Sequence, residues 1–245
     1  MADAGSRAAC VTGVSRGLGV ALAAELLARG FEVVGIGRSA HASLQHSCFR
    51  FVAADLASLD TLDALAAGAF DAMAARSPAF AVLINNAATA APVGRIGALA
   101  ADDIAAAFAA NLAAPAILAN AFVRSLAGRA ALRIVDVSSG SAVKAMAGTA
   151  AYCAAKAGLE MWNAAAAAGA APGVEFVTLR PGIIDTPMQE FVRTRSADDL
   201  PDVAMFREFH AGGSLQSPEA TARRIVERVV LGAQKSGAVL RYQEL

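Results

Sequence analysis

Cysteine is scarce in this sequence: there are three in 245 residues, and no two stand at C-x-x-C spacing. This scarcity argues against a disulfide framework or a zinc site and favours a reducing, cytoplasmic setting. Cys48 does stand near His41 and His46, but no further ligand follows at helix or turn spacing. We therefore expect a polar loop there and no metal site.

Surplus charge of either sign is missing too, since Lys plus Arg and Asp plus Glu each number 21. Without a net field, neither nucleic acid nor an acidic membrane surface is an expected partner. The first residues lack the apolar run of a signal peptide. We also expect no stretch of about 18 uncharged apolar residues that could span a membrane.

Apolar residues, by contrast, are abundant, at 56% against 17% charged. That balance suits a sheet buried on both faces. It also leaves apolar surface for contacts between copies of the chain, so we expect a homo-oligomer. The length is that of one large α/β unit, and we expect a single domain over residues 1–245.

Short β-branched runs alternate with long alanine- and leucine-rich stretches, the pattern of βαβ units. Strands are predicted at 8–14, 32–37, 49–54, 80–85, 132–137, 175–179 and 238–241. Helices are predicted at 17–29, 58–75, 101–126, 149–170 and 218–231. We expect an α/β fold of Rossmann-like type: a doubly wound, parallel seven-stranded sheet with helices on both faces. The polar stretch 185–213 interrupts the alternation and is predicted to be a helical excursion that covers the substrate.

The first predicted strand runs into a glycine-rich turn that opens the first helix. Glycines there let backbone N–H groups approach a pyrophosphate, which the helix N-terminus favours. The predicted cofactor contacts in this turn are Gly13, Ser15, Arg16, Gly17, Leu18 and Gly19. Plain turn punctuation is the competing interpretation, and the position directly after the first strand weighs against it.

The residue that closes the second strand should select the nicotinamide cofactor, because its side chain meets the adenosine ribose. An acid there would accept from a free 2′-hydroxyl, whereas this strand ends on Arg38, followed by Ser39. Arg16 can supply a second cation to a 2′-phosphate. Either arginine alone could be a solvated surface charge, but the two together predict NADPH/NADP⁺ as the cofactor.

Two further strand ends carry candidate cofactor contacts. Asp55 can accept from the adenine amino group while Leu56 packs beside the ring, although Asp55 could simply cap the next helix. In the run NNAA over 85–88, the amide side chains of Asn85 and Asn86 can tie the central strands together, and small residues such as Ala87 admit the ribose. A plain Asn-rich turn would give the same pattern.

The catalytic candidates begin with Tyr152 and Lys156, which stand four residues apart and so share one face of a helix. The ammonium is expected to lower the pKa of the phenol toward the working range. Ser139 ends the fifth strand, where its hydroxyl can donate to a carbonyl oxygen as charge develops, or merely form a turn. Asn111 lies inside a predicted helix, where Asn is a mediocre helix former. Two interpretations are open: a helix irregularity that holds a water beside Lys156, or an exposed polar residue.

These motifs, TGxxxGxG over 12–19, NNA, Asn111, Ser139 and YxxxK, stand in the order of a known family. The sequence resembles the short-chain dehydrogenase/reductase family over nearly its whole length. The resemblance implies a proton relay through water at Asn111, Lys156 and the ribose hydroxyls to Tyr152, with Ser139 orienting the substrate carbonyl. It also implies that Tyr152 and Lys156 contact the cofactor.

A narrower resemblance, to the sepiapterin reductase and bacterial benzil reductase branch, rests on the segments 180–189, 213–215 and 235–238. It implies that the nicotinamide and its carboxamide are held by Pro181, Gly182, Ile184 and Thr186. Two departures matter. Ala88 replaces the last glycine of NNAG, and Arg241 stands where sepiapterin reductase offers an aspartate to the pterin.

The resemblance therefore implies an NADPH-dependent carbonyl reductase that transfers hydride to a ketone or a vicinal diketone such as benzil. Reduction of sepiapterin or another pterin and oxidation of a secondary alcohol are alternatives, and a non-catalytic NADP(H)-sensing protein is a remote one. The resemblance also implies pairing through helices 101–126 and 149–170, as a homodimer or homotetramer.

The first prediction concerns the cofactor. Replacing Arg38 with Asp should weaken NADPH binding by up to roughly 1.5–3 kcal/mol, the worth of a charged hydrogen bond, and narrow the gap to NADH. Titration of both dinucleotides against the parent and the variant measures this. A parent that already prefers NADH would contradict our interpretation of Arg16 and Arg38.

Overall fold

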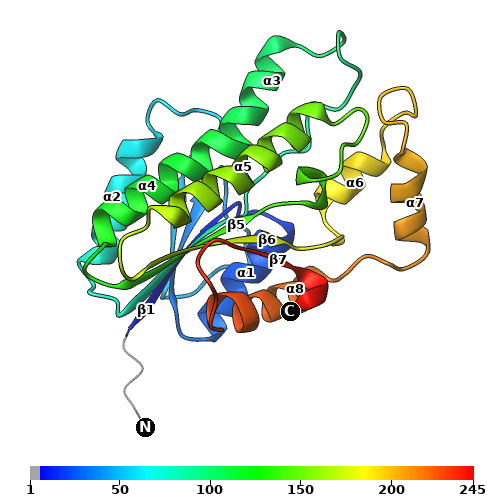
Figure 1. Ribbon diagram of the computed structural model, residues 1–245. Helices are drawn as coiled ribbons and strands as arrows, with labels where there is room; N and C mark the ends of the chain where they lie inside the picture. The colour runs from blue at the N-terminus through cyan, green and yellow to red at the C-terminus, as the bar shows by residue number, and fades with distance from the viewer. Residues whose placement is uncertain (1–5) are drawn as a thin grey trace.

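The computed structural model describes residues 6–245 and has one parallel sheet with helices packed on both faces (Figure 1). Its strands are β1 (Arg7–Thr12), β2 (Glu32–Gly37), β3 (Phe49–Ala53), β4 (Phe80–Asn85), β5 (Ala131–Val137), β6 (Val174–Arg180) and β7 (Ala238–Arg241). They pair in the order β3-β2-β1-β4-β5-β6-β7, every pair parallel. The strand order reverses between β1 and β4, the place where open α/β sheets bind ligands beyond the strand ends. The predicted fold class is confirmed.

Two helical layers cover the sheet. On one face lie α1 (Gly17–Ala28) and α8 (Pro218–Ile225), which continues into a π-helical turn, η3 (Val226–Val230). The other face carries α2 (Leu62–Ala74), α4 (Ala114–Leu126) and α5 (Ala150–Ala168) (Figure 1). Successive strand residues alternate between the layers: Val82 and Val135 pack toward α1, whereas Leu83 and Ile134 pack toward α2 and α4.

The predicted helix 101–126 is continuous, made of α3 (Ala101–Phe108), a π-helical turn η1 (Ala109–Ala113) and α4. Its length and composition are those of a membrane span, so the expectation that no such stretch exists was wrong. The apolar face of α4 instead packs within the protein, where Phe122 is fully buried. Phe122 meets Phe70 of α2 edge-on, with ring centroids 5.1 Å apart. Such a pair adds about 0.5–1.5 kcal/mol to the gain from burial alone.

Of the element boundaries that differ from the sequence prediction, two have a clear local reason. β1 ends at Thr12 instead of residue 14, because Gly13 takes a φ of +78° and its N–H bonds the carbonyl of Ile36 at 2.8 Å. α2 begins at Leu62, four residues late, because a carboxylate oxygen of Asp55 accepts from the N–H of Ala57 at 3.0 Å and forms a turn.

The excursion 185–213 is helical as predicted, with α6 (Pro187–Arg193) and α7 (Val203–Ala211). Both helices lie at the end of the molecule to which β6 leads (Figure 1). A third apolar cluster joins them to the segments that follow β4 and β5. Its members are Ala90, Val192, Leu200 and Val203, with Val93, Met146, Met188, Phe191 and Phe206 against them. The loop between α6 and α7 is seated closely, since a Cβ added at Gly148 would lie 2.0 Å from the carbonyl oxygen of Asp199.

Candidate active site

The glycine turn between β1 and α1 is too tight for a side chain at its last glycine. A Cβ added at Gly19 would lie 2.2 Å from the carbonyl oxygen of Gly13 and 2.7 Å from Nδ2 of Asn86. Gly13 and Gly17 have φ angles of +78° and +58°, which L side chains rarely adopt. Leu18 points into the core, whereas Arg16 is exposed. The start of α1 thus presents backbone and a cation to a ligand.

Thr12 joins this turn to the end of β4. Its hydroxyl oxygen accepts from the N–H groups of Asn86 and Ala87, at 3.0 and 2.9 Å. The side-chain amide of Asn86 donates back to the carbonyl oxygen of Thr12 at 2.9 Å. Sequence reasoning missed Thr12, although it opens the TGxxxGxG motif. The Asn86 amide, predicted to tie the central strands together, therefore joins the end of β4 to that of β1 and braces the glycine turn.

Two cations flank the glycine turn. Arg16 precedes α1, and Arg38 follows β2, whose Ile36 is bonded to the turn. Both arginines are exposed, as is Ser39, and within residues 6–245 neither arginine forms an ion pair. A narrow glycine cradle next to unpaired cations fits the pyrophosphate and the 2′-phosphate of NADP(H).

The segment after β6 lies against the same turn. The methyl carbon of Thr186 is 3.1 Å from where a Gly17 Cβ would stand. Ile184 bridges to Gln216, and Pro181 is buried. Thr186, predicted to hold the nicotinamide and its carboxamide, is therefore next to Gly17, which is predicted to hold the pyrophosphate.

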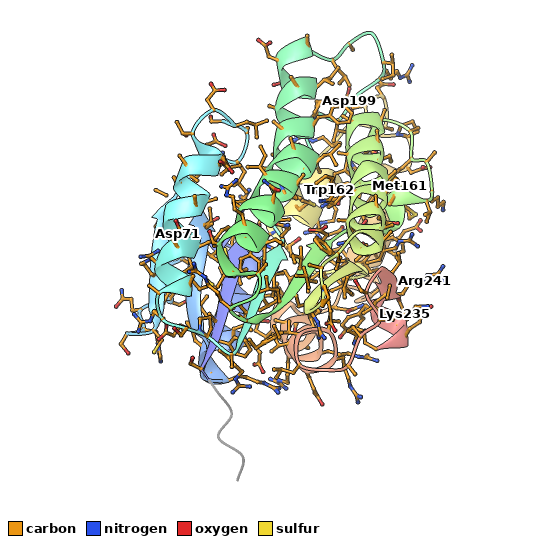
Figure 2. All side chains as sticks on the ribbon, turned by 60° about the vertical axis from the view of Figure 1, so that its left-hand side comes forward. Asp71, Met161, Trp162, Asp199, Lys235 and Arg241 are labelled. Carbon is orange, nitrogen blue, oxygen red and sulfur yellow. The ribbon has the colours of Figure 1, made fainter. Side chains whose placement is uncertain are left out.

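The C-terminal tail approaches this segment through a residue that sequence reasoning did not select. A Cβ at Gly182 would lie 3.5 Å from the side-chain nitrogen of Gln243. Arg241 is more than half exposed, and its guanidinium is 3.6 Å from Glu244 (Figure 2). The tail reaches the predicted nicotinamide segment, but through Gln243.

Tyr152 and Lys156 share one face of α5, as predicted, and Lys156 is buried. The ammonium nitrogen donates to the carbonyl oxygen of Val137 at 2.7 Å and lies 5.9 Å from the centre of the Tyr152 ring. Burial lowers the pKa of Lys156 to about 8, against the opposing effect of Asp136 and Glu160. The ammonium is thus held at the end of β5, facing two acids.

The pKa of Tyr152 contradicts the expectation that Lys156 brings it down. Burial raises it above its ordinary value, and a hydrogen bond with Ser139 only partly opposes the rise. The reason is geometric, since Lys156 donates to Val137 and not to the phenol. The phenol is therefore protonated at neutral pH, the state a proton donor needs.

Ser139 and Asn111 complete the predicted set. The Ser139 hydroxyl oxygen accepts from the N–H of Ser141 at 3.1 Å, so its own proton points elsewhere and can be donated to the Tyr152 oxygen or to a carbonyl oxygen. Asn111 lies in the π-helical turn η1, the irregularity expected there, and is buried. Its amide exchanges two 2.8 Å hydrogen bonds with the backbone of Thr89, so it ties η1 to the segment after β4.

The site is also supported by a buried carboxylate, Asp136, which was not selected from the sequence. Asp136 of β5 accepts from Asn85 at 2.8 Å and from Asn163 at 2.9 Å. Burial raises its pKa, and the two amide hydrogen bonds and the charge of Lys156 oppose that rise. Asn85, which we expected to tie the central strands together, does so through this bond.

Known proteins match this chain along most of its length. Residues 7–197 match the family described as short chain dehydrogenase. A benzil reductase ((S)-benzoin forming) of Bacillus subtilis (strain 168) is 28% identical over 91% of this chain and 93% of its own. A second, from Bacillus cereus, is 29% identical over 96% and 98%. An NADPH-dependent pterin aldehyde reductase of Arabidopsis thaliana is 30% identical over 75% and 77%.

Solved structures agree with the fold. The KRED1-Pglu enzyme superposes with a TM-score of 0.82 at 25% identity, over 96% of this chain and 100% of its own. A short chain dehydrogenase from Burkholderia cenocepacia J2315, in complex with NADP, has a TM-score of 0.73 at 26% identity, over 95% and 94%.

The glycine cradle gives the second prediction. Gly19→Ala should weaken NADP(H) binding by roughly tenfold or more, about 1.4 kcal/mol, because the new methyl forces Gly13 and Asn86 away. Gly68 of α2 is the matched control, since a Cβ there meets nothing within 4 Å. Gly68→Ala should bind normally and gain about 0.5–1 kcal/mol of stability. Dinucleotide titration and urea unfolding measure both, and normal binding by Gly19→Ala would reject the cradle.

Proposed function

Because the chain belongs to the short chain dehydrogenase family, we propose that it is an NADPH-dependent reductase of ketones and vicinal diketones such as benzil. One observation carries the proposal: Tyr152 stands on α5 one turn before the buried Lys156, whose ammonium nitrogen lies 5.9 Å from the centre of the tyrosine ring. The two Bacillus relatives named benzil reductase support the substrate class.

Reduction needs a proton donor beside the carbonyl oxygen. The nicotinamide supplies hydride to the carbonyl carbon when it is bound. Ser139 donates a hydrogen bond to the carbonyl oxygen and so holds that oxygen beside Tyr152. Tyr152 transfers its phenolic proton to that oxygen, which becomes the alcohol. Lys156, with the π-helical turn at Asn111, returns a proton from solvent to the phenolate.

NADPH is our proposed cofactor, because Arg16 and Arg38 flank the glycine turn, form no ion pair within residues 6–245, and no acid closes β2. The name of the Arabidopsis relative and the NADP bound to the Burkholderia protein support it. The proposed setting is the cytoplasm, and the proposed role of α6 and α7 is to cover the substrate.

We also propose that two or four copies assemble through α4 and α5. Met161 and Trp162 of α5 are labelled in Figure 2 and are large apolar side chains left exposed, Met161 by 70%. A partner helix on this face would cover both. Burial of such side chains between copies is the usual source of oligomer stability.

The third prediction tests the proton donor. Tyr152→Phe keeps the ring but removes the proton, so benzil turnover should fall by roughly a hundredfold or more while NADPH still binds. Tyr242→Phe is the control, because this second tyrosine lies under Arg224, 4.9 Å from the guanidinium. If Tyr152→Phe and Tyr242→Phe both lose turnover, or if neither does, Tyr152 is rejected as the donor. NADPH binding by the parent without turnover on any carbonyl would favour the sensing alternative.

The fourth prediction concerns the substrate. A pterin ring needs an acceptor for its N–H groups, and the tail offers none at position 241, because Arg241 is more than half exposed, lies beside Glu244 and can only donate. Each pterin N–H group buried without an acceptor costs about 1–3 kcal/mol. A diketone has only acceptors and loses nothing. We expect a higher kcat/KM for benzil than for sepiapterin, and Arg241→Asp should narrow the difference. A parent that clearly prefers sepiapterin would overturn this argument.

A further inference from the structure

A carboxylate outside the predicted catalytic set is fully engaged by two neighbouring strands. Glu160 lies on α5 one helical turn after Lys156. One of its oxygens accepts from the Ser138 hydroxyl at 2.7 Å and from Nε of Arg180 at 2.8 Å. The other accepts from Nη2 of Arg180 at 2.6 Å. The Glu160 and Arg180 side chains are 13% and 14% exposed, so this bidentate pair is not a solvated surface contact.

The partners of Glu160 adjoin two segments that the proposed reaction uses. Ser138 precedes Ser139, which holds the carbonyl, and Arg180 precedes Pro181, which opens the nicotinamide segment. The backbone N–H of Ser138 also bonds the carbonyl of Leu179 at 2.7 Å, so the ends of β5 and β6 are level. One carboxylate therefore fixes the helix that carries Lys156 to both strand ends.

The charge of Glu160 also bears on Lys156. Burial alone would raise the pKa of Glu160, but the hydrogen bonds from Arg180 and Ser138 outweigh it and hold the pKa below its usual range. Glu160 is therefore ionised at neutral pH. The charged groups around it are Lys156 and Arg180. Arg180 in turn faces Glu244 of the tail, and Lys156 also faces Asp136.

We propose that Glu160 is a positioning residue for the reduction, which aligns the strand ends with α5 and supplies negative charge to Lys156, while Arg180 holds it in place. This inference rests on the proposed function for its catalytic meaning. Its electrostatic part concerns the protein alone and can be tested without a substrate.

The sequence contains three lysines, so NMR of the lysine side-chain εCH₂ groups should give three signals, of which Lys156→Met identifies one. Glu160→Gln removes an anion and leaves Arg180 unpaired, so the pKa of Lys156 should fall by roughly one unit. Arg180→Gln removes a cation and leaves Glu160 ionised, so the pKa should rise. Glu160→Asp keeps the charge and should leave the pKa near that of the parent. The proposal would be overturned if the pKa of Lys156 moved in the same direction in Glu160→Gln and Arg180→Gln, or if it moved in neither variant.

Kinetics test the catalytic part. In Glu160→Gln we expect kcat for benzil to fall by roughly tenfold with KM for NADPH little changed, and the alkaline limb of the kcat profile to move to lower pH. The matched control is Glu175→Gln, because Arg133 and Glu175 join the same two strands at their opposite ends. It should lower stability without moving the limb. The proposal is contradicted if the alkaline limb of the kcat profile moves equally in Glu175→Gln, or if it does not move in Glu160→Gln. If the parent protein reduces no carbonyl compound, the proposed function is wrong. The NMR experiment still tests the electrostatic part of the inference.

Discussion

The burial of the Lys156 ammonium is the constraint on which the rest of the site depends. An unpaired charge at this depth would cost several kcal/mol, so the surrounding chain must supply partners. The carbonyl of Val137 takes one proton at 2.7 Å, and Asp136 and Glu160 supply negative charge. Each acid needs partners of its own, which are amides for Asp136 and an arginine for Glu160. The polar network beneath and beside the site follows from this one buried cation.

The parallel sheet makes this arrangement possible because its register brings the strand ends level. Asn85 pairs with Asp136, and Asp136 with Thr178, so β4, β5 and β6 end at the same height. Thr12 then binds the end of β1 to that of β4 with three hydrogen bonds. The segments that would hold cofactor and substrate are therefore fixed by main-chain pairing, and loop length has little influence on them.

The sequence predicted the sheet, its helices and the pair Tyr152 and Lys156, because hydrophobic periodicity and helical spacing are local patterns. Contacts between distant segments have no such pattern. The spacing of Glu160 and Arg180 does not indicate that they form a hydrogen bond across 20 residues. The sequence likewise did not indicate that the tail approaches Gly182 through Gln243 instead of Arg241. The predicted direction of the Tyr152 pKa shift was wrong, because the burial of the phenol and the hydrogen bond of Lys156 to Val137 depend on the three-dimensional structure. Helix 101–126, which carries charge only near its two ends, has the length and composition of a membrane span, and this was not expected from the sequence.

The third apolar cluster, which joins α6 and α7 to the segments after β4 and β5, shares no buried residue with the two clusters that hold the sheet. Substitutions at sites without common partners change stability independently. Side chains such as Met188, Phe191 and Phe206 can therefore drift during evolution without loosening the sheet or the buried cation. Under the proposed roles of α6, α7 and the buried cation, descendants of this chain can diverge in what they recognise while they inherit the same chemistry, because the two parts pack separately.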